Sequence, residues 1–349
     1  MKRKTATIAI FCMFLISTPC FVHAYSIEKQ DAETRGSGPI SVRNQMPLYL
    51  IYLQMAPEKA SVAQKSKLVI SGDYLVSNIT ASAFTPATSL YDVQIDCEVS
   101  RIAIDLRYGL YENFEIGMEI PFIGLSSGYL DNFVEGIEDG IGATTPRSRE
   151  RQGSYEFNYV LTYNNKKLIE LKHSTEGLGD IVLGAKYQLL KDDGGFMPNL
   201  SLRSAVKFPT ADKDDLLGSG EFDYGLGILL DKGFFDRLYL YMGANMIFIE
   251  KPGFLSEMDI DGEYFSGMLA TEYFFTERFS AVAQISGNST PYTYTGTNVM
   301  DNDAYELGLG VNYTWKEKEN VSFYFAVVEN LESGSSPDVS FETGLNWGF

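Results

Sequence analysis

The chain has 349 residues, 45% of them hydrophobic, and it contains 22 Tyr, 23 Phe and 32 Gly residues. Its 46 acidic and 28 basic side chains give a formal net charge of −18, which argues against a nucleic-acid-binding protein because phosphate binding depends on cationic contacts. Beyond the first residues, no stretch approaches the roughly 18 continuous apolar residues of a transmembrane helix. Moderate hydrophobicity with many aromatic residues and glycines is typical of proteins that cross a bilayer with strands.

The first 24 residues have the pattern of a secretory signal peptide. Basic residues are followed by an apolar run from about Ala6 to Ile16 and by a Val-x-Ala cleavage site at Val22 and Ala24. We therefore expect residues 1–24 to be removed on export. Cys97 is then the only cysteine left, so no intrachain disulfide is possible.

Residues 25–65 show no regular alternation. A short apolar piece over 49–55 lies between Pro47 and Pro57. We expect a periplasmic or luminal segment, tucked into or under the domain that follows, because counting it as a strand breaks the even strand number found below.

From residue 66 onward, apolar and polar residues alternate in runs of about ten, separated by residues that favour turns. A period of two predicts strands with one apolar face. In the second run the alternation changes phase near Ser100 and Arg101, which predicts either a β-bulge or an extension beyond the bilayer. Twelve strands are predicted, at about 67–77, 91–109, 114–122, 179–190, 198–208, 220–231, 236–249, 262–275, 278–287, 303–315, 320–329 and 336–349.

The connections between these strands alternate in length. The short ones are 111–113, 191–197, 232–235, 276–277 and 316–320, and the longer ones are 78–90, 124–177, 209–219, 250–261, 288–302 and 330–338. Short periplasmic turns and long outer loops are typical of outer-membrane barrels, in which the sheet closes so that every backbone group is paired. The sequence therefore predicts an all-β fold, a transmembrane antiparallel up-and-down β-barrel of about 12 strands over residues 66–349. A soluble β-sandwich explains the alternation but not the loop lengths.

The last strand carries a pattern of its own. Glu342, Gly344, Trp347 and Phe349 follow the order polar, Gly, aromatic, aromatic, and the final residue is the last aromatic. This pattern resembles the C-terminal assembly signal of bacterial outer-membrane β-barrels. The resemblance implies the barrel assembly machinery as a partner and the outer membrane of a Gram-negative bacterium as the location.

Three stretches resemble an uncharacterised family of Gram-negative outer-membrane proteins that carries only a domain-of-unknown-function label. They are Arg-Asn-Gln-Met-Pro-Leu at 43–48, Gly-Tyr-Leu-Asp-Asn-Phe at 128–133 and Leu-Leu-Gly-Ser-Gly at 216–220. The resemblance covers nearly all of the mature chain. It implies an outer-membrane β-barrel and assigns no activity and no functional residues.

Charged residues occupy alternate positions of several strands, which we expect to face the lumen. They are Asp92, Asp96, Glu98, Arg101, Asp105, Arg107, Glu115, Glu119, Lys186, Arg203, Lys207, Asp223, Glu306 and Glu342. A 12-strand barrel is wider than the eight-strand barrels that side chains fill and narrower than open porins. These charges either form a salt-bridged plug that stabilises the wall or line a narrow polar pore. Both readings hold together if the N-terminal segment or the long loop moves.

The longest predicted loop, 124–177, has three features. Apolar residues at helical spacing over 130–139 predict a short amphipathic helix that constricts the barrel mouth. Arg147, Arg149 and Arg151 suit lipopolysaccharide phosphates, although a solvated loop is the simpler reading. Residues 155–163 and 166–173 alternate around Asn164 and Asn165, which predicts an external hairpin. The expected surroundings of the protein are outer-membrane lipids and lipopolysaccharide.

Catalytic and metal-binding patterns are weak. His173 is the only histidine of the mature chain, and its neighbour Ser174 is a poor partner because adjacent strand residues point to opposite faces. The acidic clusters 212–215 and 259–263 lack a full calcium-loop pattern. We expect no enzyme activity, no metal and no cofactor.

The sequence therefore favours a narrow channel or transporter for small polar solutes. Two alternatives stay open: a closed barrel with a structural or surface-interaction role, and a lipid hydrolase with its site at the outer rim.

Overall fold

The computed structural model describes residues 36–82, 90–128, 130, 157–235, 237–315, 321–331 and 334–349. The chain separates into two compact units, Met1–Glu33 and Thr34–Phe349, and all described residues belong to the second. None of the helices among them is long and apolar enough to cross a membrane.

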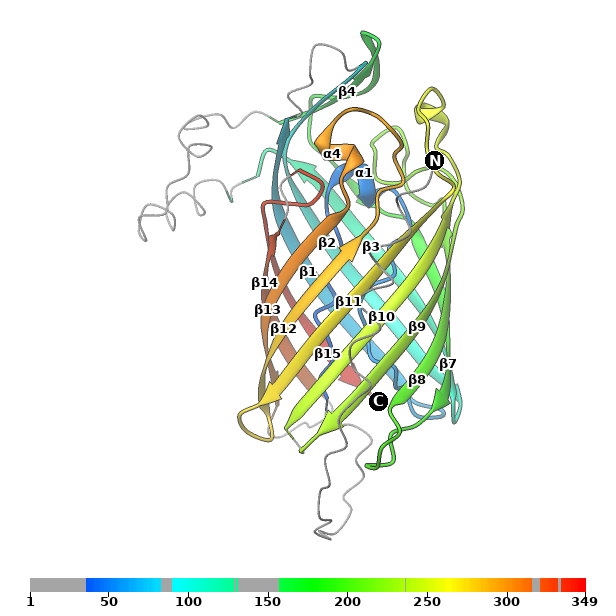
Figure 1. Ribbon diagram of the computed structural model, residues 1–349, viewed down its shortest axis with the longest axis vertical. Helices are drawn as coiled ribbons and strands as arrows, with labels where there is room; N and C mark the ends of the chain where they lie inside the picture. Colours follow the sequence, from blue (N-terminus) through cyan, green and yellow to red (C-terminus); the bar gives the residue numbers. More distant parts are fainter. Residues whose placement is uncertain are drawn as a thin grey trace, which may run out of the picture. The chain divides into compact units, whose positions relative to one another are not determined.

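The second unit is built on twelve antiparallel strands that close into a barrel (Figure 1). They are β1 (Leu68–Ser82), β2 (Tyr91–Tyr111), β3 (Phe114–Ser126), β7 (Ile181–Leu190), β8 (Asn199–Phe208), β9 (Asp223–Phe234), β10 (Leu238–Ile249), β11 (Glu263–Phe274), β12 (Phe279–Asn288), β13 (Ala304–Thr314), β14 (Val321–Asn330) and β15 (Val339–Gly348). The ring closes where β1 pairs with β15, from Val69 opposite Gly348 to Asn78 opposite Val339. The predicted fold class is confirmed, and each predicted strand corresponds to one strand of the ring.

Three further strands lie at the end of the barrel that carries the long loops. They are β4 (Asn158–Tyr163), β5 (Lys166–Leu171) and β6 (Thr175–Leu178). Strand β4 pairs with the upper end of β2, and β6 pairs with the upper end of β3. The hairpin of β4 and β5 is confirmed, and it turns through Asn164 and Asn165, whose φ angles of 49° and 64° are left-handed conformations that Asn tolerates.

In the described ranges, the helices whose bounds are complete are short. These are α1 (Pro47–Leu50), η3 (Gly253–Leu255) and α4 (Asn298–Asp301). The helix expected within 130–139 falls almost entirely outside the described residues, as do Arg147, Arg149 and Arg151.

Strand β2 has one inner face along its whole length, but the chemistry of that face changes. Its register against β1 and β3 runs without a break through Ser100 and Arg101, so the predicted bulge is wrong there; the only shift lies between Gly109 and Tyr111. Beyond Glu98 the strand outruns β3, whose pairing ends at Ser126, and continues against β4. The change of phase therefore marks the extension of the strand.

The reason for the changed phase is a reversal of environment. In the lower half, the outward residues Ile102 and Ile104 are 51% and 42% exposed, as lipid-facing residues are. In the upper half, the inward residues Val93 and Ile95 are 0% and 1% exposed. They belong to an apolar core that fills the barrel end below the long loops. Apolar residues thus change faces while the backbone alternation stays constant.

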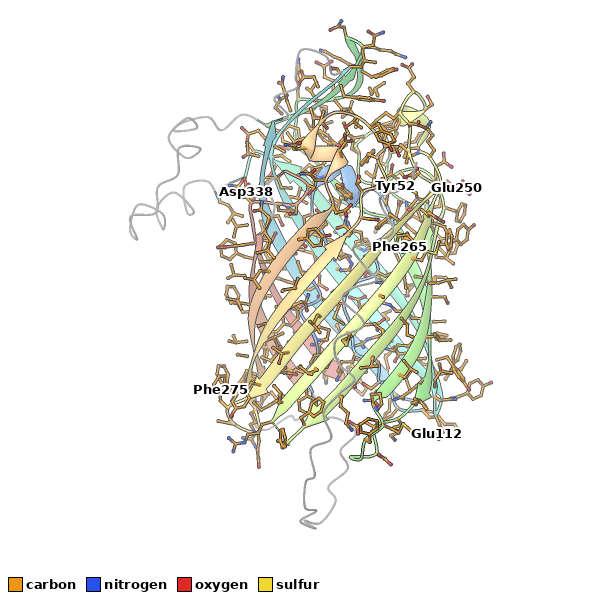
Figure 2. The ribbon with its side chains drawn as sticks, in the orientation of Figure 1. Tyr52, Glu112, Glu250, Phe265, Phe275 and Asp338 are labelled. Carbon is orange, nitrogen blue, oxygen red and sulfur yellow. The ribbon has the colours of Figure 1, made fainter. Side chains whose placement is uncertain are left out.

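The outer face of the ring carries many exposed large apolar side chains, which stand out from the strands in Figure 2. Tyr108, Tyr313 and Trp315 lie exposed near the ends of their strands, at the end that carries the short turns. Such a belt is typical of the membrane interface.

Candidate functional site: the plugged lumen

Residues 36–65, here called the plug, fill the lumen without forming a strand of the ring (blue in Figure 1). The chain rises to α1 at the loop end and returns to a bridge between Lys65 and Gly109 near the start of β1. Its contacts reach widely separated strands, among them Gln284 of β12 with Ile40 and Asp231 of β9 with Ala60.

The wall supplies the hydrogen bonds that the irregular plug backbone lacks. Three wall carboxylates accept from plug N–H groups over 2.7–2.9 Å: Glu272 from Ser37, Asp223 from Leu53 and Asp231 from Ala60. Three wall cations donate to plug carbonyls over 2.7–3.1 Å: Arg203 to Ala56, Lys186 to Lys59 and Lys207 to Ile51. Unpaired buried backbone groups are costly, so these side chains hold a segment with almost no secondary structure of its own.

Glu58 anchors the descending arm of the plug by ion pairs. Its carboxylate lies 2.8 Å from Lys186 Nζ and 2.8 Å from Arg203 Nη1, and Lys186 also pairs with Glu115 at 2.9 Å. Burial opposes ionisation of Glu58, but Lys186 and Arg203 outweigh it and hold its pKa well below the ordinary value of 4.5.

Arg43 anchors the ascending arm. It pairs with Glu119 of β3, which also pairs with Arg101 of β2, and Arg101 lies 3.3 Å from Asp73 of β1. These groups form one buried network that joins the plug to three neighbouring strands. Beside it, Glu342 of β15 accepts a hydrogen bond from Tyr324 at 2.7 Å.

A third ion-pair group lies near the loop end. Lys207 Nζ is 2.7 Å from Asp180 and 3.2 Å from Asp223, and its side chain is 3% exposed. Leu53 and Ile51 of the plug contact this group through their backbone.

The structure places eleven of the fourteen predicted luminal residues on the inner face of the ring. They are Arg101, Asp105, Arg107, Glu115, Glu119, Lys186, Arg203, Lys207, Asp223, Glu306 and Glu342. Several of these residues form ion pairs, either with the plug or with a neighbouring residue of the wall. Glu306 borders a small cavity of about 40 Å³.

The other three predicted luminal residues require a correction. Asp92, Asp96 and Glu98 share the outer face of β2 with Ile102 and lie in its upper extension. Glu98 is buried there, and its carboxylate accepts a hydrogen bond from the Leu130 N–H at 2.9 Å. The prediction was wrong because the acidic face of the upper half of β2 was assumed to face the lumen.

Some site residues were not predicted. Asp231 and Glu272 follow the same alternation as their inward neighbours, so the periodicity of β9 and β11 was a usable signal. Arg43 and Glu58 had no such signal, because the plug has no periodic pattern and its partners are distant in the sequence.

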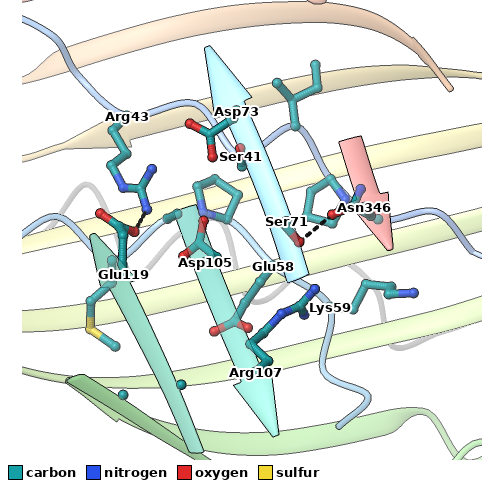
Figure 3. A pocket seen from close by; sticks show the side chains of 18 of the residues that line it. Ser41, Arg43, Glu58, Lys59, Ser71, Asp73, Asp105, Arg107, Glu119 and Asn346 are labelled. Atoms are coloured by element: carbon teal, nitrogen blue, oxygen red, sulfur yellow. Dashed lines mark hydrogen bonds and ion pairs between the residues drawn. The ribbon is translucent and has the colours of Figure 1, made fainter. Parts of the chain in front are cut away.

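A cavity of about 220 Å³ lies between the plug and the wall (Figure 3). Figure 3 shows Arg43, Asp105 and Glu119 to one side of it and Arg107 with Lys59 to the other. A charged interior space therefore remains between the plug and the wall.

The residues of the predicted assembly signal lie on β15 and just beyond it. Trp347 and Phe349 are exposed, with ring centroids 4.4 Å apart. Gly344 faces inward, where an added Cβ would collide with the Tyr324 ring. Their role in assembly stays a prediction.

The other predicted features are peripheral. His173 and Ser174 are exposed in the connection between β5 and β6 and share no hydrogen bond among the described residues. Across all the residues that the structure describes, no group of three or more His, Cys, Asp and Glu side chains is arranged to hold a metal ion.

Similar solved structures are channels and porins. The chain matches an outer membrane channel from Pseudomonas putida F1 with a TM-score of 0.56 and 14% identity, covering 85% of this chain and 100% of that one. It matches a KdgM porin in complex with disordered oligogalacturonate (TM-score 0.41, 8% identity, 81% and 99% covered) and the Pseudomonas putida toluene transporter TodX (0.39, 10%, 82% and 89%). The first likeness shows a shared fold.

No curated protein matches the sequence. The sequence profile of a family described as protein of unknown function (DUF3187) matches residues 12–349. Because that match spans nearly the whole chain, the protein belongs to this family.

Proposed function

We propose that the protein is a channel of the Gram-negative outer membrane that passes small polar solutes when the plug leaves the lumen. The observation that carries the proposal is how the plug is held. Its lower arms meet the wall through ion pairs and side-chain-to-backbone hydrogen bonds, as at Glu58, Ser37 and Ala60. Water can replace such contacts far more readily than it can replace an apolar core.

The lumen wall supports the polar-solute part of the proposal. Eleven predicted acids and bases face inward, and charged rings select solutes by charge and size. A channel for apolar solutes would not require these charged side chains. Ionisable residues within a membrane domain are costly, so they are a functional signal.

The outer-membrane setting is part of the same proposal. A lipid-facing apolar belt, the short turns at one end and the long loops at the other fit a barrel whose loops face outward. The proposal also includes export through residues 1–24, assembly through the last strand, and contact with lipopolysaccharide.

The test is single-channel conductance of the purified protein in planar bilayers. We expect the full chain to be closed or to open rarely, and a variant lacking residues 36–62 to conduct steadily. A milder variant is Gly225→Val, because an added side chain at Gly225 collides with Met55 of the plug. Its matched control is Gly72→Val, because Gly72 has no atom nearer than 4.0 Å at the Cβ position.

A second candidate function, a permanently closed structural or surface-interaction barrel, is favoured by the apolar core at the loop end. There Tyr49 and Tyr52 of the plug pack with Tyr292 and with Val93 of β2. Absence of conductance from a folded variant without residues 36–62 would reject the channel and favour this second function.

A further inference from the structure

The cavity beside the plug has an excess of positive charge on one side. Lys59, Arg107, Lys186 and Arg203 all line it, together with the carboxylates of Glu58 and Glu115 (Figure 3 shows Lys59, Arg107 and Glu58). Four cations therefore meet two carboxylates on this side. The other charged residues of the lining are one cation, Arg43, and three carboxylates, Asp73, Asp105 and Glu119.

Both carboxylates are already paired. Glu58 pairs with Lys186 and Arg203, and Glu115 pairs with Lys186. Among the described residues, neither Arg107 nor Lys59 has a carboxylate oxygen within 4.0 Å.

Lys59 is held in an unfavourable setting. Its Nζ donates to the Gly36 carbonyl at 2.8 Å, a neutral partner. Burial, and next the charge of Arg107, lower the pKa of Lys59. A bound anion would oppose both effects, because it places negative charge between two cations.

Among the described residues, no further acid forms an ion pair with Lys59 or Arg107, although Glu58 also acts on Arg107 through its charge. Asp231 and Glu272 interact with Lys59 at longer range but do not line the cavity, and their oxygens accept hydrogen bonds from Ala60 and Ser37 of the plug. Asp105 lines the cavity and lies between Glu119 and Glu58 in Figure 3.

Neutral donors complete the lining. Ser71 donates to Asn346 Oδ1 at 2.6 Å, which leaves the Asn346 amide group as a donor in the cavity lining. The volume of 220 Å³ equals about seven waters at roughly 30 Å³ each, which suits a small solute rather than a polymer.

We propose that this cavity is a binding site for a small oxyanion, a carboxylate or phosphate held between Arg107 and Lys59. The guanidinium of Arg107 presents two parallel donors to such a group, and Lys59 adds a point charge. The inference rests on the proposed channel function in that it names the solute class.

The experiment is calorimetric titration of the full-length protein in detergent at low ionic strength, with inorganic phosphate in one arm and malonate in the other. We expect binding in at least one arm and a loss of at least tenfold in affinity for the double variant Lys59→Gln, Arg107→Gln. Arg107→Lys, which keeps the charge, should lose less. Lys251→Gln, an exposed loop position, is the charge-matched control.

The outcomes separate this site from the channel. If the double variant does not fold, Lys59→Gln alone replaces it, because the Lys59 side chain belongs to the plug and not to the ring. Binding of both anions that is unchanged in the variants, or no binding by the wild type, overturns the site. Binding that depends on Arg107 and Lys59 supports the site even if the variant without residues 36–62 fails to conduct, a result that would reject only the channel.

Discussion

At the scale of single residues, the inner charges act as pairs whose members depend on each other. Lys207 is the clearest case, because one ammonium group serves two buried carboxylates, Asp180 and Asp223. A buried ion pair adds little net stability, since desolvation offsets its attraction, but loss of one partner leaves an uncompensated charge.

We therefore expect Lys207→Met to destabilise the barrel by about 3–5 kcal/mol. Urea unfolding in detergent measures this through the fluorescence of the two tryptophans, Trp315 and Trp347. Lys251→Met removes the same charge from an exposed loop and should change the unfolding free energy by less than about 0.5 kcal/mol. Equal effects of the two substitutions would show that the Lys207 pairs have no structural role.

Glu58 gives the plug a predictable pH dependence. Its folded-state pKa lies below the ordinary 4.5, so its ionised form stabilises the docked plug in full above about pH 4.5. That contribution is lost progressively as the pH falls from there through the lowered folded-state pKa.

We expect Glu58→Gln to weaken plug docking by about 1.5–3 kcal/mol at pH 7 and to reduce the loss of docking between pH 5 and pH 3. Protease cleavage within residues 36–65, compared at both pH values, measures docking. Glu277→Gln, at the exposed turn between β11 and β12, is the control and should retain the wild-type dependence. An unchanged pH profile for Glu58→Gln would refute the anchoring role of this residue.

At the scale of elements, β2 shows how one strand serves two environments. Its lower half faces lipid with Ile102 and Ile104, and its upper half faces the apolar core with Val93 and Ile95. The backbone needs no bulge, because only the side-chain chemistry of each face changes.

Single cysteines with spin labels on β2, in a Cys97→Ala background, test this assignment in bilayers. We expect labels at Ile102 and Ile104 to be reached by oxygen dissolved in lipid, and a label at Asp92 to be reached by a water-soluble nickel reagent. A label at Ile95 should be reached by neither, because that side chain is 1% exposed. Oxygen access at Asp92 would place the upper half of the strand in the membrane instead.

Pro121 in β3 illustrates the limits that pairing sets on an element. Residues 114–119 of β3 pair with β7, and residues 122–125 pair with β6. Pro121 lies between the two pairings, where a missing N–H is tolerated, and its carbonyl accepts from Gly179 at 2.8 Å.

At the scale of the whole molecule, the ring has no free edge. Each of its strands therefore has a hydrogen-bonded neighbour on both sides. Thr343 of β15 lies opposite Tyr74 of β1 and Phe325 of β14. Proline there removes a donor from a strand that is paired on both sides, and hydrocarbon supplies no replacement partner.

We expect Thr343→Pro to prevent barrel closure. The readout is electrophoretic mobility without boiling, in which a closed barrel migrates faster than the heat-denatured chain. Thr343→Val keeps the strand and should retain the fast band. A fast band from Thr343→Pro would mean that the β1–β15 seam tolerates an opening.

The number, order and lipid-facing side of the strands could be predicted because they depend on a local pattern. Across the bilayer, each strand separates lipid from a polar interior, and the alternation of residues such as Ile102 and Ile104 records that contrast directly. The same contrast identified the inner positions of Arg203 and Lys186. It misled at Asp92, because above the membrane the apolar side is the inner one.

The sequence by itself thus determined the closed antiparallel barrel and its twelve strands, since a period of two needs only neighbouring residues to be read. The tertiary structure alone decided the path of the plug and the partners of its charges. Arg43 meets Glu119 and Glu58 meets Lys186 across 76 and 128 positions of the chain. A segment without periodicity gains its conformation only from the wall that surrounds it, so no local pattern records where it lies.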